Sequence, residues 1–242
     1  DRNVAVGNES LEAYNPTTAG TDSYNVAVGF RALTANTTAG ANTAIGGLAL
    51  SANTTGQSNV AIGTNALDAN VTSNYNTAVG ASALGANTGG QNTAVGYSSL
   101  LANTTGIYNV AVGYNSADAN TTGSSITVLG HNALSANTTG SNNVAVGRNA
   151  LVANTTAGQN TAVGTFSLDA NTTGAENVAI GYNALSANTT ASNNTAVGQA
   201  ALKVNTTGTQ NTAVGTYSLD AMVTGNNNTA VGYNSLSAAT AS

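Results

Sequence analysis

The chain has 242 residues and a net charge of −5, and only 5% of its residues are charged, against roughly a quarter in a typical soluble domain. Its four basic residues, Arg2, Arg31, Arg148 and Lys203, are scattered, so the chain has no basic stripe of the kind that binds nucleic acid or an anionic membrane surface. No apolar run approaches the ~20 residues that span a bilayer, and the absence of cysteine excludes disulfides and thiolate metal sites.

One short phrase, Asn-Thr/Val-Ala-Val/Ile-Gly, recurs along the chain, as in Asn42–Gly46 and Asn177–Gly181. A fixed short period predicts units that cannot fold alone and must stack on their neighbours. The glycines that close the phrase, called marker glycines below, mostly fall seventeen residues apart: Gly7, Gly29, Gly46, Gly63, Gly80, Gly96, Gly113, Gly130, Gly147, Gly164, Gly181, Gly198, Gly215 and Gly232.

Each repeat offers two short segments of alternating residues, counted here from its marker glycine as position 0. Positions 14 and 16 carry Val/Thr and Val/Ile around an alanine at position 15, which is typical of a half-buried strand. Leucine at position 4 and alanine at position 6 predict a second short strand. The marker glycine is expected to turn one corner, and Asn-Thr-Thr-Gly, as at Asn53–Gly56, the other.

These features predict an all-β fold, a β-solenoid (β-roll) of about fourteen 17-residue coils with two short strands per coil. Residues 1–28 are expected to form an irregular first coil, with an insertion that includes Pro16, and residues 29–242 one continuous regular array. The coil from Gly80 to Gly96 is one residue short. Asparagines at positions 7 and 13 are expected to form ladders of side-chain amides along the stack.

The phrases Val60–Gly63 and Val178–Gly181, each preceded by asparagine, resemble the Val-Ala-Ile-Gly repeats of trimeric autotransporter adhesin heads. Similar Asn-Thr-Ala-Val-Gly-Tyr-Asn-Ala-Leu strings occur in phage tail-fibre-like proteins. The resemblance covers essentially the whole chain and implies a β-roll in which three chains pack side by side into a fibre that holds host surfaces. The present repeat departs from the adhesin pattern in its longer coil and in its nearly invariant leucine.

No catalytic, cofactor-binding or metal-binding residues are predicted, and the chain is not expected to be an enzyme. Its carboxylates are dispersed, apart from Glu9 and Glu12 in the irregular first coil, so no acid pair or ligand cluster is available. Asn-Thr-Thr also matches the N-glycosylation acceptor pattern, although turn chemistry alone explains these residues. The candidate acceptors are Asn36, Asn53, Asn103, Asn120, Asn137, Asn154, Asn171, Asn188 and Asn205.

Aromatic residues recur at position 1, directly after the marker glycine. This file is either a lateral contact between chains or a recognition stripe, and its single histidine is expected to be exposed or in an interface rather than catalytic. The candidate contact stripe comprises Phe30, Tyr97, Tyr114, His131, Tyr182 and Tyr233.

The sequence therefore favours a non-enzymatic, extracellular structural fibre or adhesin segment at a cell or virion surface. Its expected partners are copies of itself, as a homotrimer or an end-to-end polymer, and a host-surface or glycan receptor. The alternative is an ice-binding β-solenoid, because such proteins also combine few charges with a regular array of threonine and asparagine.

Overall fold

The computed structural model describes residues 2–15 and 23–239, and every regular element in them is a three-residue strand. The chain divides into two compact units, Asp1–Thr122 and Gly123–Ser242. The first unit contains β1 (Val4–Val6), β2 (Val26–Val28), β3 (Thr43–Ile45), β4 (Val60–Ile62), β5 (Thr77–Val79), β6 (Thr93–Val95) and β7 (Val110–Val112). The second contains β8 (Thr127–Leu129), β9 (Val144–Val146), β10 (Thr161–Val163), β11 (Val178–Ile180), β12 (Thr195–Val197), β13 (Thr212–Val214) and β14 (Thr229–Val231).

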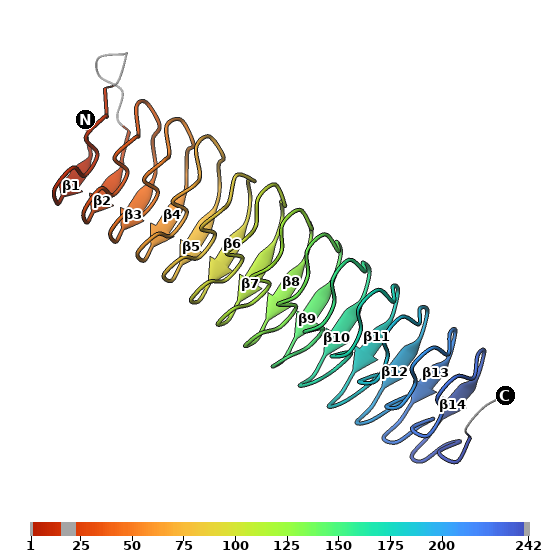
Figure 1. Ribbon diagram of the computed structural model, residues 1–242. Coiled ribbons are helices and arrows are strands. Elements are labelled where there is room, and N and C mark those ends of the chain that lie inside the picture. Colours follow the sequence, from red (N-terminus) through yellow and green to blue (C-terminus); the bar gives the residue numbers. More distant parts are fainter. Residues whose placement is uncertain (1, 16–22, 240–242) are drawn as a thin grey trace. The chain divides into compact units, whose positions relative to one another are not determined.

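Within each unit, every strand pairs in parallel with the strand of the next coil, residue for residue. In the first unit Ala44 of β3 lies opposite Ala61 of β4, and in the second Ala162 of β10 lies opposite Ala179 of β11. The strands of a unit lie side by side in chain order, each on its own coil (Figure 1). The predicted all-β solenoid is confirmed. β1 pairs in register with β2, while the predicted insertion at Pro16 lies outside the described residues.

The prediction of a second strand in each coil, around the leucine at position 4, is wrong. Leu48 and Leu50 have φ angles of 60° and 53°, in the left-handed region. The N–H of Ala49 donates to the carbonyl of Gly46 (3.3 Å), which closes a turn with positive φ at its third residue, as in a type II turn. The N–H of Leu50 still bonds the carbonyl of Ala66 in the next coil (2.9 Å). Overlapping turns therefore replace a strand on this side of the coil, and the backbone hydrogen bonds between successive coils are kept.

The core of each coil is small and dense. The alanine at position 15 and the adjacent residues at positions 3 and 4 are fully buried, as at Ala44, Ala49 and Leu50. Two consecutive residues both point inward because the left-handed residue at position 4 reverses the alternation that a strand would impose. The leucines that fill the core are Leu33, Leu50, Leu67, Leu84, Leu100, Leu134, Leu151, Leu168, Leu185, Leu202 and Leu219.

The marker glycines turn the corner after the strand, as predicted. Gly46 has a φ of +134°, a conformation that side chains rarely adopt. A Cβ on Gly46 would also lie 2.6 Å from the backbone carbon of Gly63 in the next coil. The corner thus requires glycine both for its backbone angle and for the close approach of successive coils.

Candidate functional site

The two asparagine columns form hydrogen-bonded ladders inside the coils, as the sequence predicted. The carbonyl of Gly56 accepts from Asn42 Nδ2 (2.8 Å) and from Asn53 Nδ2 (3.0 Å). Asn42 Oδ1 accepts from the backbone N–H of Asn59 in the next coil (2.9 Å). All of these side chains are fully buried, so the ladders satisfy polar groups that burial would otherwise penalise. Their role is structural.

The nine candidate glycosylation residues are asparagines at position 7, and none of their side chains reaches the surface. Asn154 is representative: its Nδ2 donates to Asn137 Oδ1 (2.9 Å) and to the carbonyl of Ala157 (3.0 Å). A glycan on this atom would replace one of these donors and would need space that the packed coil does not offer. Glycosylation stays a prediction, but a modified coil would have to differ from the coil described here. All nine candidates are 0% exposed: Asn36, Asn53, Asn103, Asn120, Asn137, Asn154, Asn171, Asn188 and Asn205.

The two threonines of each turn have different surroundings. The hydroxyl of Thr172, at position 8, donates to the carbonyl of Thr189 in the next coil (3.0 Å). Thr173, at position 9, is exposed. The second threonine of the pair is thus the more exposed of the two.

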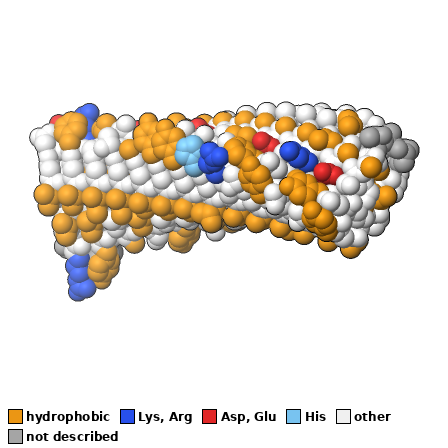
Figure 2. Space-filling view, turned by 90° about the horizontal axis from the view of Figure 1, so that it is seen from below, with side chains coloured by type: hydrophobic (Ala, Val, Ile, Leu, Met, Phe, Trp, Pro, Cys, Tyr) orange, Lys and Arg blue, Asp and Glu red, His pale blue; other side chains and the backbone are white. Residues whose placement is uncertain are grey.

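The strands carry an outward face made of two columns of side chains, at positions 14 and 16. In β11, Ala179 is fully buried while Ile180 is 39% exposed, because successive side chains of a strand point to opposite faces. Position 14 is valine or threonine, and position 16 is valine, isoleucine or leucine in every strand. We call these two columns the strand face. Figure 2 shows hydrophobic side chains gathered in files on a surface that carries few charged groups.

The six residues of the predicted contact stripe are all exposed, but only some of them meet. Tyr97 and Tyr114 stack with ring centroids 5.4 Å apart, whereas several coils without an aromatic residue at position 1 separate Phe30 from them. In the second unit, Tyr182 meets the ring of Phe166 edge-on, with centroids 6.4 Å apart. Phe166 is at position 2, so counting position 1 alone missed it.

Another set of exposed aromatics was also missed. Tyr24, Tyr75 and Tyr108 each lie five residues before the next marker glycine, which is position 12 of a regular coil, and are 52%, 64% and 54% exposed. Their constant offset from the marker glycine is visible in the sequence and could have identified them.

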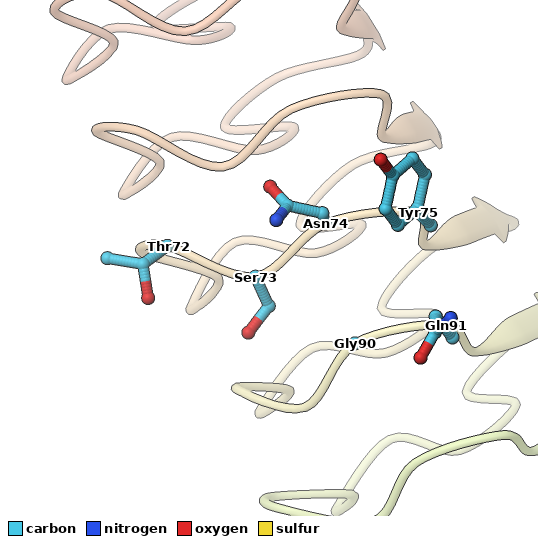
Figure 3. A pocket seen from close by; sticks show the side chains of 6 residues that line it. All are labelled: Thr72, Ser73, Asn74, Tyr75, Gly90 and Gln91. Carbon is cyan, nitrogen blue, oxygen red and sulfur yellow. The ribbon is translucent and has the colours of Figure 1, made fainter.

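A shallow hollow of about 380 Å³ lies at the short coil of the first unit, between the turn at Thr72–Tyr75 and the residues Gly90 and Gln91 of the next coil (Figure 3). The short coil lacks the residue at position 9, which elsewhere in the repeat is an exposed threonine. The turn at Thr72–Tyr75 of the preceding coil is therefore left uncovered. The side chains around the hollow diverge. Asn74 Oδ1 accepts from the N–H of Gln57 in the preceding coil (2.6 Å), and the Ser73 hydroxyl donates to the carbonyl of Thr88 in the following one. The hollow therefore lacks the convergent polar groups of a ligand site.

Three aspartates at position 5 have perturbed acidities. Desolvation by burial raises the pKa of Asp68, Asp118 and Asp169 above 3.8, although nearby backbone N–H groups oppose this shift. They recur at every third coil, so they are not neighbours. Among the described residues no group of three or more His, Asp or Glu side chains could hold a metal ion. The part of the chain that the structure describes has no helix long and apolar enough to cross a membrane.

A scan against protein-family models and searches of curated proteins and of solved structures found no match. Within the described residues, two exposed surfaces combine regular geometry with side chains suited to recognition. They are the strand face and the aromatic file at positions 1 and 2.

Proposed function

We propose that this chain is a non-enzymatic segment of an extracellular fibre, in which the strand face packs against copies of the same chain. The observation that carries the proposal is the orientation of the strands. From β2 to β14, every strand except β8 buries a small alanine and turns its larger β-branched residues outward, as in β11, where Ala179 is buried and Ile180 is 39% exposed. Apolar side chains gathered on one surface mark an interaction site.

The length of the repeat array fits such an interface. Fully burying a valine or isoleucine stabilises by roughly 1.5–3 kcal/mol, so covering a side chain that is already partly buried gains on the order of 1 kcal/mol. Each unit has seven such residues at position 16. Association itself costs about 4–15 kcal/mol, so a few coils would bind weakly and a long array would bind stably.

Copies of the same chain are the partners that this face fits best. A uniform column without charge offers no electrostatic pattern for a specific foreign partner, whereas repeated identical side chains match a neighbouring copy along its whole length. The resemblance to adhesin heads supports a homotrimer of chains side by side, located at a cell or virion surface. Attachment to a host surface would then be the function of the assembled fibre.

Light scattering of the purified chain, with negative-stain imaging, tests the proposal. We expect a trimer or a larger lateral assembly. The double variant Val163→Lys and Ile180→Lys places two charges on the strand face and should give monomers with an unchanged β-type circular dichroism spectrum. Thr173→Lys, at an exposed turn position, is the matched control and should still assemble. A monomeric wild-type chain would overturn the proposal.

Ice binding is the second candidate, and the placement of position 14 favours it. Threonine or valine at this position lies on the strand face beside the column at position 16. Neighbouring residues of one column are ~4.8 Å apart and the two columns ~6.6 Å apart, so the stiff β-branched side chains form a regular two-dimensional array. Thermal hysteresis that is lost in Thr195→Lys and kept in Thr173→Lys would establish this function. An absence of both thermal hysteresis and inhibition of ice recrystallisation would exclude it.

A further inference from the structure

We infer that Arg148 and the rings next to it form a binding site for an acidic saccharide. The Cζ atom of Arg148 lies 4.6 Å from the centroid of the Phe166 ring. Phe166 in turn contacts Tyr182 edge-on, and Tyr182 is 51% exposed. Three successive coils of the second unit therefore place a cation and two rings in one exposed row.

The guanidinium of Arg148 is held in place but has no acidic partner. Among the described residues its side chain makes no hydrogen bond or ion pair. Its guanidinium instead makes a cation–π contact with the Phe166 ring. Arg31 of the first unit is different, because its Nε bonds Glu9 Oε2 at 2.6 Å while its Cζ lies 5.6 Å from the Phe30 ring. Stacking on an aromatic face orients a guanidinium and leaves its N–H groups at the edge. The N–H groups of Arg148 are thus available to an anion.

The chemistry of the row selects the ligand class. A guanidinium binds carboxylate and sulfate groups with two parallel hydrogen bonds. The exposed ring of Tyr182 offers a flat apolar surface and a hydroxyl that donates and accepts, which suits the C–H face and the hydroxyl groups of a pyranose. Figure 2 shows Lys or Arg, His and hydrophobic side chains on one face, with Asp or Glu side chains among them. A saccharide bearing a carboxylate or a sulfate group satisfies both features.

This inference rests on the adhesive part of the proposed function and names the class of ligand that the fibre would bind. A single site with an exposed ion pair is weak, but a fibre with several copies of the chain engages a repeating polymer at many points. Linked sites can raise the apparent affinity by about 10²–10⁴ over that of one site. A polysaccharide is therefore a more suitable partner than a free sugar.

Biolayer interferometry with the immobilised chain tests the site, with three soluble probes. Polygalacturonate carries carboxylates, dextran sulfate carries sulfates, and dextran is neutral. We expect one or both acidic polymers to bind, more weakly as salt increases, and dextran not to bind. Arg148→Gln should weaken binding roughly tenfold, the equivalent of about one charge-assisted hydrogen bond. Arg148→Lys should recover part of that loss, because it restores the charge without the planar fork.

Arg31→Gln is the matched control, since Arg31 also lies against a phenylalanine ring but is paired with a carboxylate. It should leave binding unchanged, whereas Phe166→Leu, which keeps apolar bulk and removes the ring, should weaken it. Equal losses in Arg31→Gln and Arg148→Gln would mean that binding is nonspecific and would overturn the inference. Binding of dextran as strong as that of the acidic polymers, or binding of none of the three, would overturn it as well. If a lateral assembly is seen by scattering but no acidic polymer binds, the fibre stands and the saccharide site falls.

Discussion

Two adjacent glycines provide a sharp test of why the repeat has its marker residue. Gly46 has a φ of +134° and a Cβ added to it would lie 2.6 Å from the backbone carbon and 2.7 Å from the oxygen of Gly63. Gly47 has no positive φ, and a Cβ added there would meet nothing within 4 Å. Gly46→Ala and Gly47→Ala make the same chemical change one residue apart.

The expected difference follows from two separate penalties at Gly46. Forcing alanine into a backbone region reserved for glycine costs roughly 1–3 kcal/mol. The clash is with backbone atoms, which cannot rotate away, so the coils must separate and strain the bond from the Gly63 N–H to the Ile45 carbonyl (2.7 Å). Such overpacking costs about 1–3 kcal/mol. Gly46→Ala should therefore lower the free energy of unfolding by about 2–6 kcal/mol.

Gly47→Ala should be neutral or stabilising by about 0.4–1 kcal/mol, because alanine restricts the unfolded chain. Urea denaturation followed by circular dichroism measures both variants, with the midpoint compared at constant slope. If Gly46→Ala unfolds at the same urea concentration as Gly47→Ala, the close approach of the coils at the marker glycine is not real.

Three further changes probe the core, the amide ladder and a buried carboxylate. Leu185→Ala should lower the free energy of unfolding by about 2–5 kcal/mol through loss of apolar contact and a new cavity, and urea denaturation measures this. Asn160→Ala should cost about 1–3 kcal/mol, because the buried backbone N–H of Asn177 loses its acceptor, while Thr173→Ala, at the exposed position, should stay within about 0.5 kcal/mol of wild type in the same assay. Because burial raises the pKa of Asp169 above 3.8, the folded state holds this proton more tightly than the unfolded state. The contribution of Asp169 to stability should therefore be greatest below pH 3.8 and should fall as pH rises through the raised pKa. Asp169→Asn should flatten that fall in thermal melts taken across the range, and an unchanged slope would contradict the assignment.

The period and the special glycines made the solenoid predictable from the sequence. A marker glycine at a fixed spacing, as at Gly46 and Gly63, requires each coil to repeat the backbone of the one before. The amide ladders were predictable for the same reason, since Asn42 and Asn59 occupy equal places in successive coils and so meet. In both cases, stacking of the coils brings residues at equal positions of successive repeats into contact.

The conformation within a coil was less predictable. The alternation of Leu50 and Ala52 is typical of a strand, but it also fits tandem turns in which Leu50 is left-handed. Leucine gives no warning of a positive φ, because it adopts this angle only where the neighbouring coils impose it. The sequence also did not reveal that Ile180 points outward. Apolar residues occupy both faces of the strand, so either Ala179 or Ile180 could have faced the core. The pairing of Arg148 with Phe166 depends on two residues from different coils at different positions, and no spacing within one repeat reveals it.

Cross-linking through a single introduced cysteine tests the central claim that the strand face is an interface between copies, since the chain has no cysteine of its own. Val197→Cys places a thiol at position 16 of β12, and Thr173→Cys places one at an exposed turn. With a short bifunctional thiol reagent, Val197→Cys should give covalently joined chains at low protein concentration, and Thr173→Cys should not. If the Val197→Cys thiol reacts freely with a small monofunctional reagent and yet joins no chains, the strand face faces water and the proposed fibre contact is contradicted.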